Sequence, residues 1–192
     1  MNDRRFPASQ AQRLEDPERL VWLPPADVLR ALTLQIGQTV VDVGAGTGYF
    51  AVPLAQAVGV NGNVYAVDAQ DQMLQWIAAK IDNTGLANIV LVHAEASATT
   101  LLPSSCDLYL TANVWHELED REAVLTEEKR VLRPTGRIAI LDWRPDVERV
   151  AGPPLDHRIA SEDVQEELRR SGFRNTAAIH VGLYSWLVQA DQ

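Results

Sequence analysis

A glycine-rich turn between an apolar run and a helix start constrains this sequence more than any other feature. Residues 40–50 read Val-Val-Asp-Val-Gly-Ala-Gly-Thr-Gly-Tyr-Phe, and the apolar run 39–43 is typical of a buried parallel strand. The three glycines permit positive φ angles and let a ligand approach the backbone closely. In doubly wound sheets ligands bind beyond the carboxyl ends of the strands, so the turn predicts a binding site at that edge.

The rest of the chain continues this alternation of apolar strands and amphipathic helices. We therefore expect an α/β fold: a doubly wound, Rossmann-like, mostly parallel seven-stranded sheet with an antiparallel C-terminal hairpin at its edge. The expected strands are 39–43, 64–67, 89–93, 107–110, 138–141, 176–181 and 183–189. The expected helices are about 47–58, 71–83, 118–132 and 162–171.

The length of 192 residues predicts one domain, residues 1–192. Residues 1–35 form a helical appendage and possible lid in this interpretation, with short helices at 16–23 and after the Pro24-Pro25 pair. Residues 36–192 form the ligand-binding core, and the proline-rich loop 143–160 faces the substrate. Because the core uses most of the chain, we expect a small substrate, or a homodimer in which a second subunit completes the site.

Composition excludes several classes of partner. The chain has 26 acidic against 17 basic side chains and a formal charge of −9, which makes nucleic acid an unlikely partner. It has neither a signal peptide nor an apolar run of about 18 residues, so we expect a cytoplasmic protein with no membrane segment. With Cys106 as the single cysteine, no disulfide and no cysteine-based metal centre is expected, and we assign no residue to a metal.

The glycine turn matches neither the dinucleotide-binding fingerprint nor the Walker loop. A dinucleotide fingerprint needs glycine at its sixth position, which counts from Gly44 to Tyr49, and a Walker loop needs a Gly-Lys-Ser/Thr triplet that the chain lacks. The chain also lacks a Tyr-x-x-x-Lys pair. An NAD(P)-dependent oxidoreductase is therefore the less favoured alternative.

What remains at residues 42–48, Asp-x-Gly-x-Gly-x-Gly, resembles motif I of the class I S-adenosylmethionine-dependent methyltransferases. Val-Tyr-Ala-Val-Asp at 64–68 is similar to that family's second strand, whose terminal acid, here Asp68, binds both ribose hydroxyls. A carboxylate can accept two hydrogen bonds from such a diol. Arg-Val-Leu-Arg-Pro-Thr-Gly at 130–136 resembles the turn before the family's fifth strand, so the likeness covers roughly residues 36–145.

The resemblance implies S-adenosyl-L-methionine as cofactor and methyl transfer to a small-molecule acceptor. A domain that binds S-adenosylmethionine or a related nucleoside without catalysis is the alternative. Glu95 and Ala96 correspond to the adenine contacts, although a glutamate stands where the family usually has an aspartate. Met73 either packs on the adenine ring or belongs to the core. The cofactor-binding residues implied are Asp42, Gly44, Ala45, Gly46, Thr47, Gly48, Tyr49, Asp68, Ala69, Met73, Glu95, Ala96, Asn113 and Trp115.

His116 is the candidate catalytic residue. It follows the fourth strand, near the place where the transferred methyl group should lie in this family, and histidine is the natural general base near neutral pH. A base is needed only if the acceptor must lose a proton. A histidine that caps a helix or packs in the core is the alternative.

Overall fold

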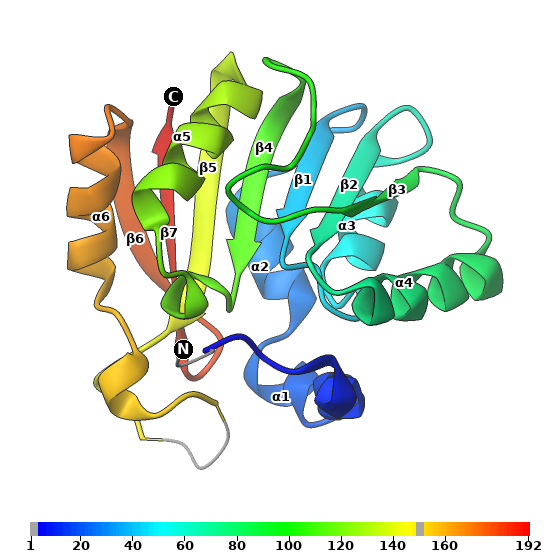
Figure 1. Cartoon of the computed structure of the whole chain (residues 1–192), viewed down its shortest axis with the longest axis horizontal. Coiled ribbons are helices and arrows are strands. Elements are labelled where there is room, and N and C mark those ends of the chain that lie inside the picture. The colour runs from blue at the N-terminus through cyan, green and yellow to red at the C-terminus, as the bar shows by residue number, and fades with distance from the viewer. Residues whose placement is uncertain (1–3, 149–151) are drawn as a thin grey trace.

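Seven strands form one sheet in the order β3-β2-β1-β4-β5-β7-β6 (Figure 1). The computed structural model describes residues 4–148 and 152–192. The strands are β1 (Thr39–Val43), β2 (Asn63–Asp68), β3 (Ile89–His93), β4 (Cys106–Ala112), β5 (Leu132–Trp143), β6 (Arg174–Val181) and β7 (Ser185–Asp191). The helices are α1 (Arg19–Trp22), α2 (Pro25–Leu32), α3 (Ala51–Val58), α4 (Asp71–Thr84), α5 (Arg121–Val131) and α6 (Ser161–Arg170).

The order in which strands are added to the sheet reverses at β1: β2 and β3 lie on one side of it, and β4 and β5 lie on the other. Strand β1 pairs in parallel with β2 on one side and with β4, which the chain reaches from β3, on the other. Strand β7 runs antiparallel to both β5 and β6. The fold class predicted from the sequence is confirmed, and the crevice of a doubly wound sheet lies beyond the carboxyl ends of β1 and β4.

Alternation of side chains along the strands builds two hydrophobic cores, one on each face of the sheet. Val40 packs with residues of α2, α3 and α4, whereas its neighbour Val41 packs with residues of α5 and α6. Since successive side chains of a strand point to opposite faces, Asp42 lies on the α3 side. That face is closed further by Leu23, which follows α1 and is fully buried.

Some element boundaries differ from those expected. Helix α3 starts at Ala51 instead of near residue 47, because the glycine turn continues through Phe50. Pro53 therefore lies in the first turn, where its missing N–H is not needed and no kink results. The turn expected at 134–136 is a bulged part of β5, in which Leu132 pairs with Cys106 before regular pairing resumes at Arg137.

The N-terminal segment passes the carboxyl ends of the parallel strands (lower edge of the sheet in Figure 1). In place of one helix at 16–23, it contains a 3-10 helix, η1 (Ala8–Glu15), followed by the single turn of α1. Residues 1–3 and 149–151, which belong to the expected appendage and substrate loop, lie outside the described residues. Within the described residues, no helix combines the length and apolar character needed to cross a bilayer.

Candidate functional site

The glycine turn after β1 packs directly against the end of β4. Gly44 has φ +66°, and a Cβ at this position would overlap the side chain of Val114. Gly46 also has a positive φ, and the Leu14 side chain of the N-terminal segment lies 3.4 Å from where its Cβ would be. Three parts of the chain therefore meet at this turn, and only glycine fits at Gly44.

Asp68 connects the end of β2 to this turn. Its Oδ2 accepts a hydrogen bond from the Gly46 amide at 2.8 Å, and its Oδ1 accepts one from the Gln70 amide at 2.9 Å. Burial raises the pKa of Asp68, and the two amide hydrogen bonds oppose the shift. The next residue, Ala69, is fixed through its carbonyl, which lies 3.0 Å from His93 Nε2. The carboxylate is therefore held rigidly at the edge of the site.

Three buried side-chain oxygen atoms around the turn have no hydrogen-bond partner. They are Asp42 Oδ2, Thr47 Oγ1 and Asn113 Oδ1. Asn113 adopts a left-handed backbone conformation with φ +58°, which reverses the chain after β4. Buried polar atoms are almost always paired in folded proteins. Their concentration here indicates a place prepared for a polar ligand.

Asp42 has an unusual electrostatic environment. It is 2% exposed, and burial raises its pKa to about 7, with a further contribution from the negative charge of Asp68. The positive charge of Arg19 and a hydrogen bond from the Ala51 amide act in the opposite direction. The carboxyl group can therefore change its ionisation near neutral pH when a charged ligand binds.

Arg19 is a residue of this region that sequence reasoning missed. Its guanidinium carbon lies 3.9 Å from the ring centroid of Tyr49, whose hydroxyl donates to the Leu23 carbonyl at 2.7 Å. The side chain is buried, with 8% of the residue exposed. The sequence offered no motif for this arrangement, because Arg19 and Tyr49 lie on different elements and meet only in the fold.

The first described residues of the chain bind across the site. Arg5 forms an ion pair with Glu95 at 2.9 Å, and the Phe6 amide donates to Glu117 Oε2 at 3.1 Å. Gln70 bonds the segment twice, through Phe6 O and the Ala8 amide. Residues that follow β2, β3 and β4 are therefore joined by one segment, which we name the strap (residues 5–8).

His116 forms a tightly held pair with Asp142. It lies in a 3-10 turn, η2 (Trp115–Glu117), and both its backbone N–H and its ring Nδ1 reach the Asp142 carboxylate, at 2.9 and 2.8 Å. Ring atom Nε2 lies 3.8 Å from Glu117 Oε1. Burial alone would lower the pKa of His116, but the charges of Asp142 and Glu117 and the hydrogen bond raise it above its ordinary value.

Glu117 is the last residue of η2, and α5 starts only after the Asp120 cap. Its side chain is largely buried, and burial raises its pKa to about 7 in spite of the Phe6 hydrogen bond and the nearby His116. The residue therefore joins the strap to the histidine. Like Asp42, it changes protonation near neutral pH.

Of four further predicted cofactor residues, Trp115 lies apart from this cluster. Trp115 is fully buried in the core that α5 and α6 form with the sheet, and its indole N–H donates to Glu167 Oε2 at 3.1 Å. This position favours a structural role for Trp115. Met73 is 2% exposed in the first turns of α4, and Ala96 is half-buried just after Glu95. Ala45 belongs to the core on the α3 face.

An aromatic cluster adjoins the carboxyl end of β5. The rings of Trp22 and Trp143 have centroids 5.1 Å apart, and Tyr184 lies 6.4 Å from Trp22. Arg158 lies over Trp143 at 5.4 Å and donates to the carbonyls of residues 144, 147 and 153. Arg158 therefore fixes the described parts of the loop beside an aromatic wall.

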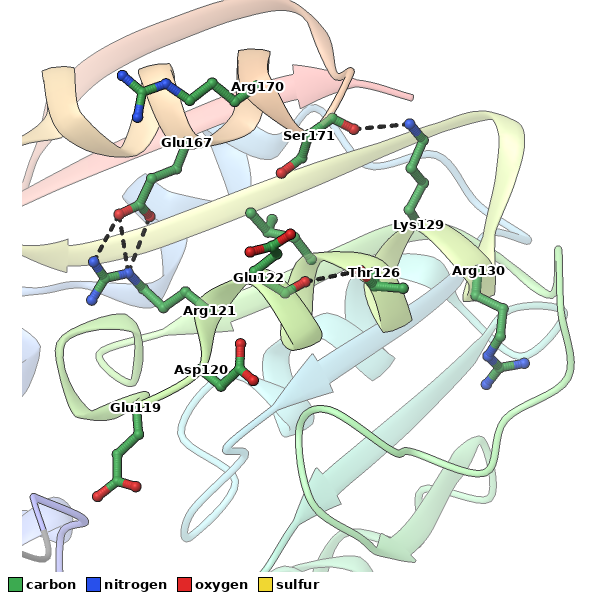
Figure 2. A pocket seen from close by; sticks show the side chains of 11 residues that line it. Glu119, Asp120, Arg121, Glu122, Thr126, Lys129, Arg130, Glu167, Arg170 and Ser171 are labelled. Carbon is green, nitrogen blue, oxygen red and sulfur yellow. Dashed lines mark hydrogen bonds and ion pairs between the residues drawn. The ribbon is translucent and has the colours of Figure 1, made fainter.

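A groove of about 800 Å³ runs between α5 and α6 (Figure 2). Among its charged side chains, Arg121 binds Glu167 at 2.8 Å, and Lys129 donates to the Ser171 carbonyl at 2.9 Å. None of the predicted site residues lines it. We therefore place the functional site at the carboxyl ends of the strands and not in this groove.

A family model and curated relatives that match this chain are all methyltransferases. Residues 41–140, just over half of the chain, match the model of the family described as "Methyltransferase domain". The demethylmenaquinone methyltransferase of Geobacillus kaustophilus is 34% identical over 116 residues, 60% of this chain and 50% of that protein. The ubiquinone/menaquinone biosynthesis C-methyltransferase UbiE of Klebsiella pneumoniae is 32% identical over 114 residues, 58% of this chain and 45% of that protein. The chain spans about half the length of these relatives.

Solved structures resemble the whole chain. A SAM-dependent methyltransferase from Aquifex aeolicus has 34% sequence identity and a TM-score of 0.91, and the match covers 97% of this chain and 98% of that one. Phosphoethanolamine N-methyltransferase 2 of Haemonchus contortus, in complex with S-adenosyl-L-methionine, has a TM-score of 0.73 and covers 87% of this chain and 51% of that one. At 14% identity, this second likeness shows a common fold alone.

Proposed function

Because this chain belongs to the methyltransferase-domain family and is an S-adenosylmethionine-dependent methyltransferase, we propose that it methylates a small acceptor that must lose a proton, with His116 as the base. The observation that carries this proposal is the pair His116–Asp142. A histidine held through Nδ1 by a buried carboxylate presents Nε2 as the atom that takes the proton.

The residues at the glycine turn fit the cofactor. The unpartnered oxygens of Asp42, Thr47 and Asn113 offer acceptors to its ammonium group and hydroxyls. The Asp68 carboxylate, at the end of β2, is the group that we assign to the ribose diol. Glu95 and Ala96 remain the proposed adenine contacts.

When bound, S-adenosylmethionine supplies a methyl group on a sulfonium that is a good leaving group. The protein holds the acceptor, excludes water and removes the proton, and orientation alone can contribute about 7–11 kcal/mol to such a reaction. Asp142 keeps the ring of His116 in one orientation and stabilises the imidazolium that forms when Nε2 accepts the proton. The charge of Glu117, whose Oε1 lies 3.8 Å from Nε2, also favours that imidazolium.

A planar aromatic acceptor fits the surroundings best. Trp22, Trp143 and Tyr184 gather beside the end of β5, where Asp142 also lies, and aromatic faces bind flat rings well. The relatives are named for demethylmenaquinone and for ubiquinone/menaquinone synthesis. We therefore put hydroquinones and phenols first among the acceptors, since their reacting atoms lose a proton on methylation.

The strap is the proposed lid of this site. Its bonds to Glu95, Gln70 and Glu117 cross the edge where the cofactor would enter. Opening these bonds would admit the cofactor, and closing them would exclude water. Cytoplasmic location and a homodimer stay predictions; sedimentation or light scattering of the purified chain would test the dimer.

The test is a transfer assay with labelled S-adenosylmethionine and a panel of hydroquinones, phenols and thiols, with a thioether as the contrast that needs no base. We expect turnover of proton-bearing acceptors by the wild type and a large loss in His116→Asn. Tight binding of the cofactor without turnover of any acceptor would favour the non-catalytic alternative. Binding of NADH in its place would favour an oxidoreductase.

A further inference from the structure

Arg19 is a buried cation without a carboxylate partner. Its Nε has no hydrogen-bond partner, and Nη1 reaches only the Leu14 carbonyl, at 3.3 Å. Among residues 4–148 and 152–192, no carboxylate lies within ion-pair distance of Arg19. Glu15, one of the two acids that act on it electrostatically, is already paired with Lys80 at 2.9 Å.

Burying an unpaired charge destabilises the folded state, which suggests that the Arg19 charge serves a ligand. Burial lowers the pKa of Arg19 to about 10, which leaves the guanidinium charged at neutral pH. The guanidinium carbon lies 3.9 Å from the Tyr49 ring centroid, a cation–π contact that holds the group in place while Nε stays without a partner. Cation–π stacking does not satisfy N–H donors.

Asp42, which carries the opposite charge when ionised, is also incompletely paired. Asp42 Oδ2 is buried without a partner, and the Arg19 charge is close enough to act on Asp42 electrostatically. The two groups do not form an ion pair with each other. A site that keeps a cation and a carboxylate apart and incompletely satisfied suits a ligand with both charges, as an α-amino acid has.

We propose that Arg19 binds the carboxylate of the amino-acid end of S-adenosylmethionine, while Asp42 receives its ammonium group. The N-terminal segment then supplies a ligand to the cofactor and is part of the binding site, in addition to covering it. Tyr49 positions Arg19 by stacking, which gives a role to the bulky residue in the place where a dinucleotide fold has glycine. The contact of Leu14 with the Gly46 position brings the same segment against the glycine turn.

The proposal is tested by equilibrium binding of three ligands that differ only at the amino-acid end. S-Adenosylhomocysteine carries ammonium and carboxylate, 5′-(3-aminopropylthio)-5′-deoxyadenosine lacks the carboxylate, and 5′-methylthioadenosine lacks both. For the wild type we expect at least tenfold tighter binding of S-adenosylhomocysteine than of the aminopropyl analogue. For Arg19→Gln we expect this preference to disappear, with binding of the two analogues changed less than twofold.

Arg13→Gln is the matched control, because Arg13 is an exposed arginine of the same segment and should leave all three affinities unchanged. Binding of 5′-methylthioadenosine reports whether the site has folded in each variant. If Arg19→Gln does not fold, Arg19→Lys carries the same test, since it keeps the charge, loses the planar fork and should reduce the preference severalfold. Unchanged preference in a folded variant, or equal loss for all three ligands, would overturn the proposal.

Discussion

The backbone N–H and the ring of His116 are both bound to one carboxylate, that of Asp142, at 2.9 and 2.8 Å. The Asp142 carboxylate also accepts the Trp143 amide at 2.8 Å, so it organises the ends of β4 and β5 together. A histidine that only filled space would not need a buried acid on its ring nitrogen. The arrangement matches a base whose orientation and charge are both controlled.

Replacing Asp142 by Asn should shift the pH dependence of methyl transfer. The charge of Asp142 raises the pKa of His116 in the folded protein, so the unprotonated base forms at a higher pH than for an ordinary histidine. The wild-type rate should therefore increase with pH as this base forms. Without the negative charge, that rise should move to lower pH, and kcat should fall by about 10- to 100-fold because the ring is less well held. Initial rates from pH 5.5 to 9 measure both effects.

Asp146→Asn is the control for that experiment, since Asp146 is an exposed acid that pairs with Arg144 beyond the end of β5. Its profile should coincide with that of the wild type. A profile of Asp142→Asn with an unshifted midpoint would show that Asp142 does not set the protonation of the histidine.

Replacing Asp68 by Ala should weaken binding of S-adenosylhomocysteine by about 1–3 kcal/mol, roughly 5- to 150-fold. Two causes act together: the proposed ribose acceptor is lost, and so is the anchor of the Gly46 amide. Isothermal titration gives the affinity. Asp82→Ala, an exposed acid of α4, should bind like the wild type. Unchanged affinity of a folded Asp68→Ala protein would refute the assignment.

Replacing Gln70 by Ala should make the strap open more easily. The Gln70 side chain makes both of its hydrogen bonds to the strap and none to cap α4, so its loss should loosen the segment while the helix remains. We expect faster dissociation of S-adenosylhomocysteine, by about three- to tenfold for one or two lost hydrogen bonds. Stopped-flow fluorescence measures the rate, with Gln75→Ala of the same helix as the control. An unaltered dissociation rate would contradict the lid proposal.

The sheet and the glycine turn were predictable because each depends on local sequence. Alternation of apolar runs and amphipathic stretches fixed the order of strands and helices, and residues 42–48 with Asp68 marked the binding edge. The first and last residues of elements were harder to predict where an adjoining turn or bulge forms part of the element. The late start of α3 follows from the length of the glycine turn, and the bulge in β5 allows Leu132 to pair with Cys106.

Contacts between distant segments could not be predicted. Nothing near His116 in the sequence indicates Asp142 as its partner, and nothing near Tyr49 indicates Arg19. Trp115 shows the reverse problem: its place after β4 predicts a cofactor contact, which stays a prediction, whereas packing between the sheet and α6 places its side chain in the core with Glu167. Side-chain direction at a strand end depends on the tertiary structure and leaves no mark in a single sequence.

Glu128 should make stability depend on pH. It is fully buried, one of its oxygens accepts the Thr111 hydroxyl and the other has no partner, and burial raises its pKa from 4.5 to about 8. Between these values the unfolded chain loses the proton and the folded protein keeps it, so the free energy of unfolding should fall as pH rises from 5 to 8. This group contributes about 2–4 kcal/mol to that fall.

Glu128→Gln keeps an acceptor for Thr111 and cannot ionise, so it should reduce the decline. Burial also raises the pKa values of Asp42 and Glu117 to about 7. The free energy of unfolding of the variant should therefore still fall as pH rises, but by less than in the wild type. Urea unfolding at pH 5, 6.5 and 8 measures the effect, and the exposed Glu122→Gln should remain parallel to the wild type. Parallel curves for Glu128→Gln as well would show that Glu128 ionises normally in the folded state.

The most direct measurement is the rate of labelled-methyl transfer to a hydroquinone by wild type and His116→Asn, both saturated with S-adenosylmethionine, across pH 6 to 9. A general base contributes about 10²- to 10⁴-fold, so the variant should be slower by that factor near pH 8 while its affinity for S-adenosylhomocysteine is unchanged. The difference should shrink as the hydroquinone ionises by itself at high pH. Equal rates for the two proteins throughout this range would contradict the role of His116 as the base.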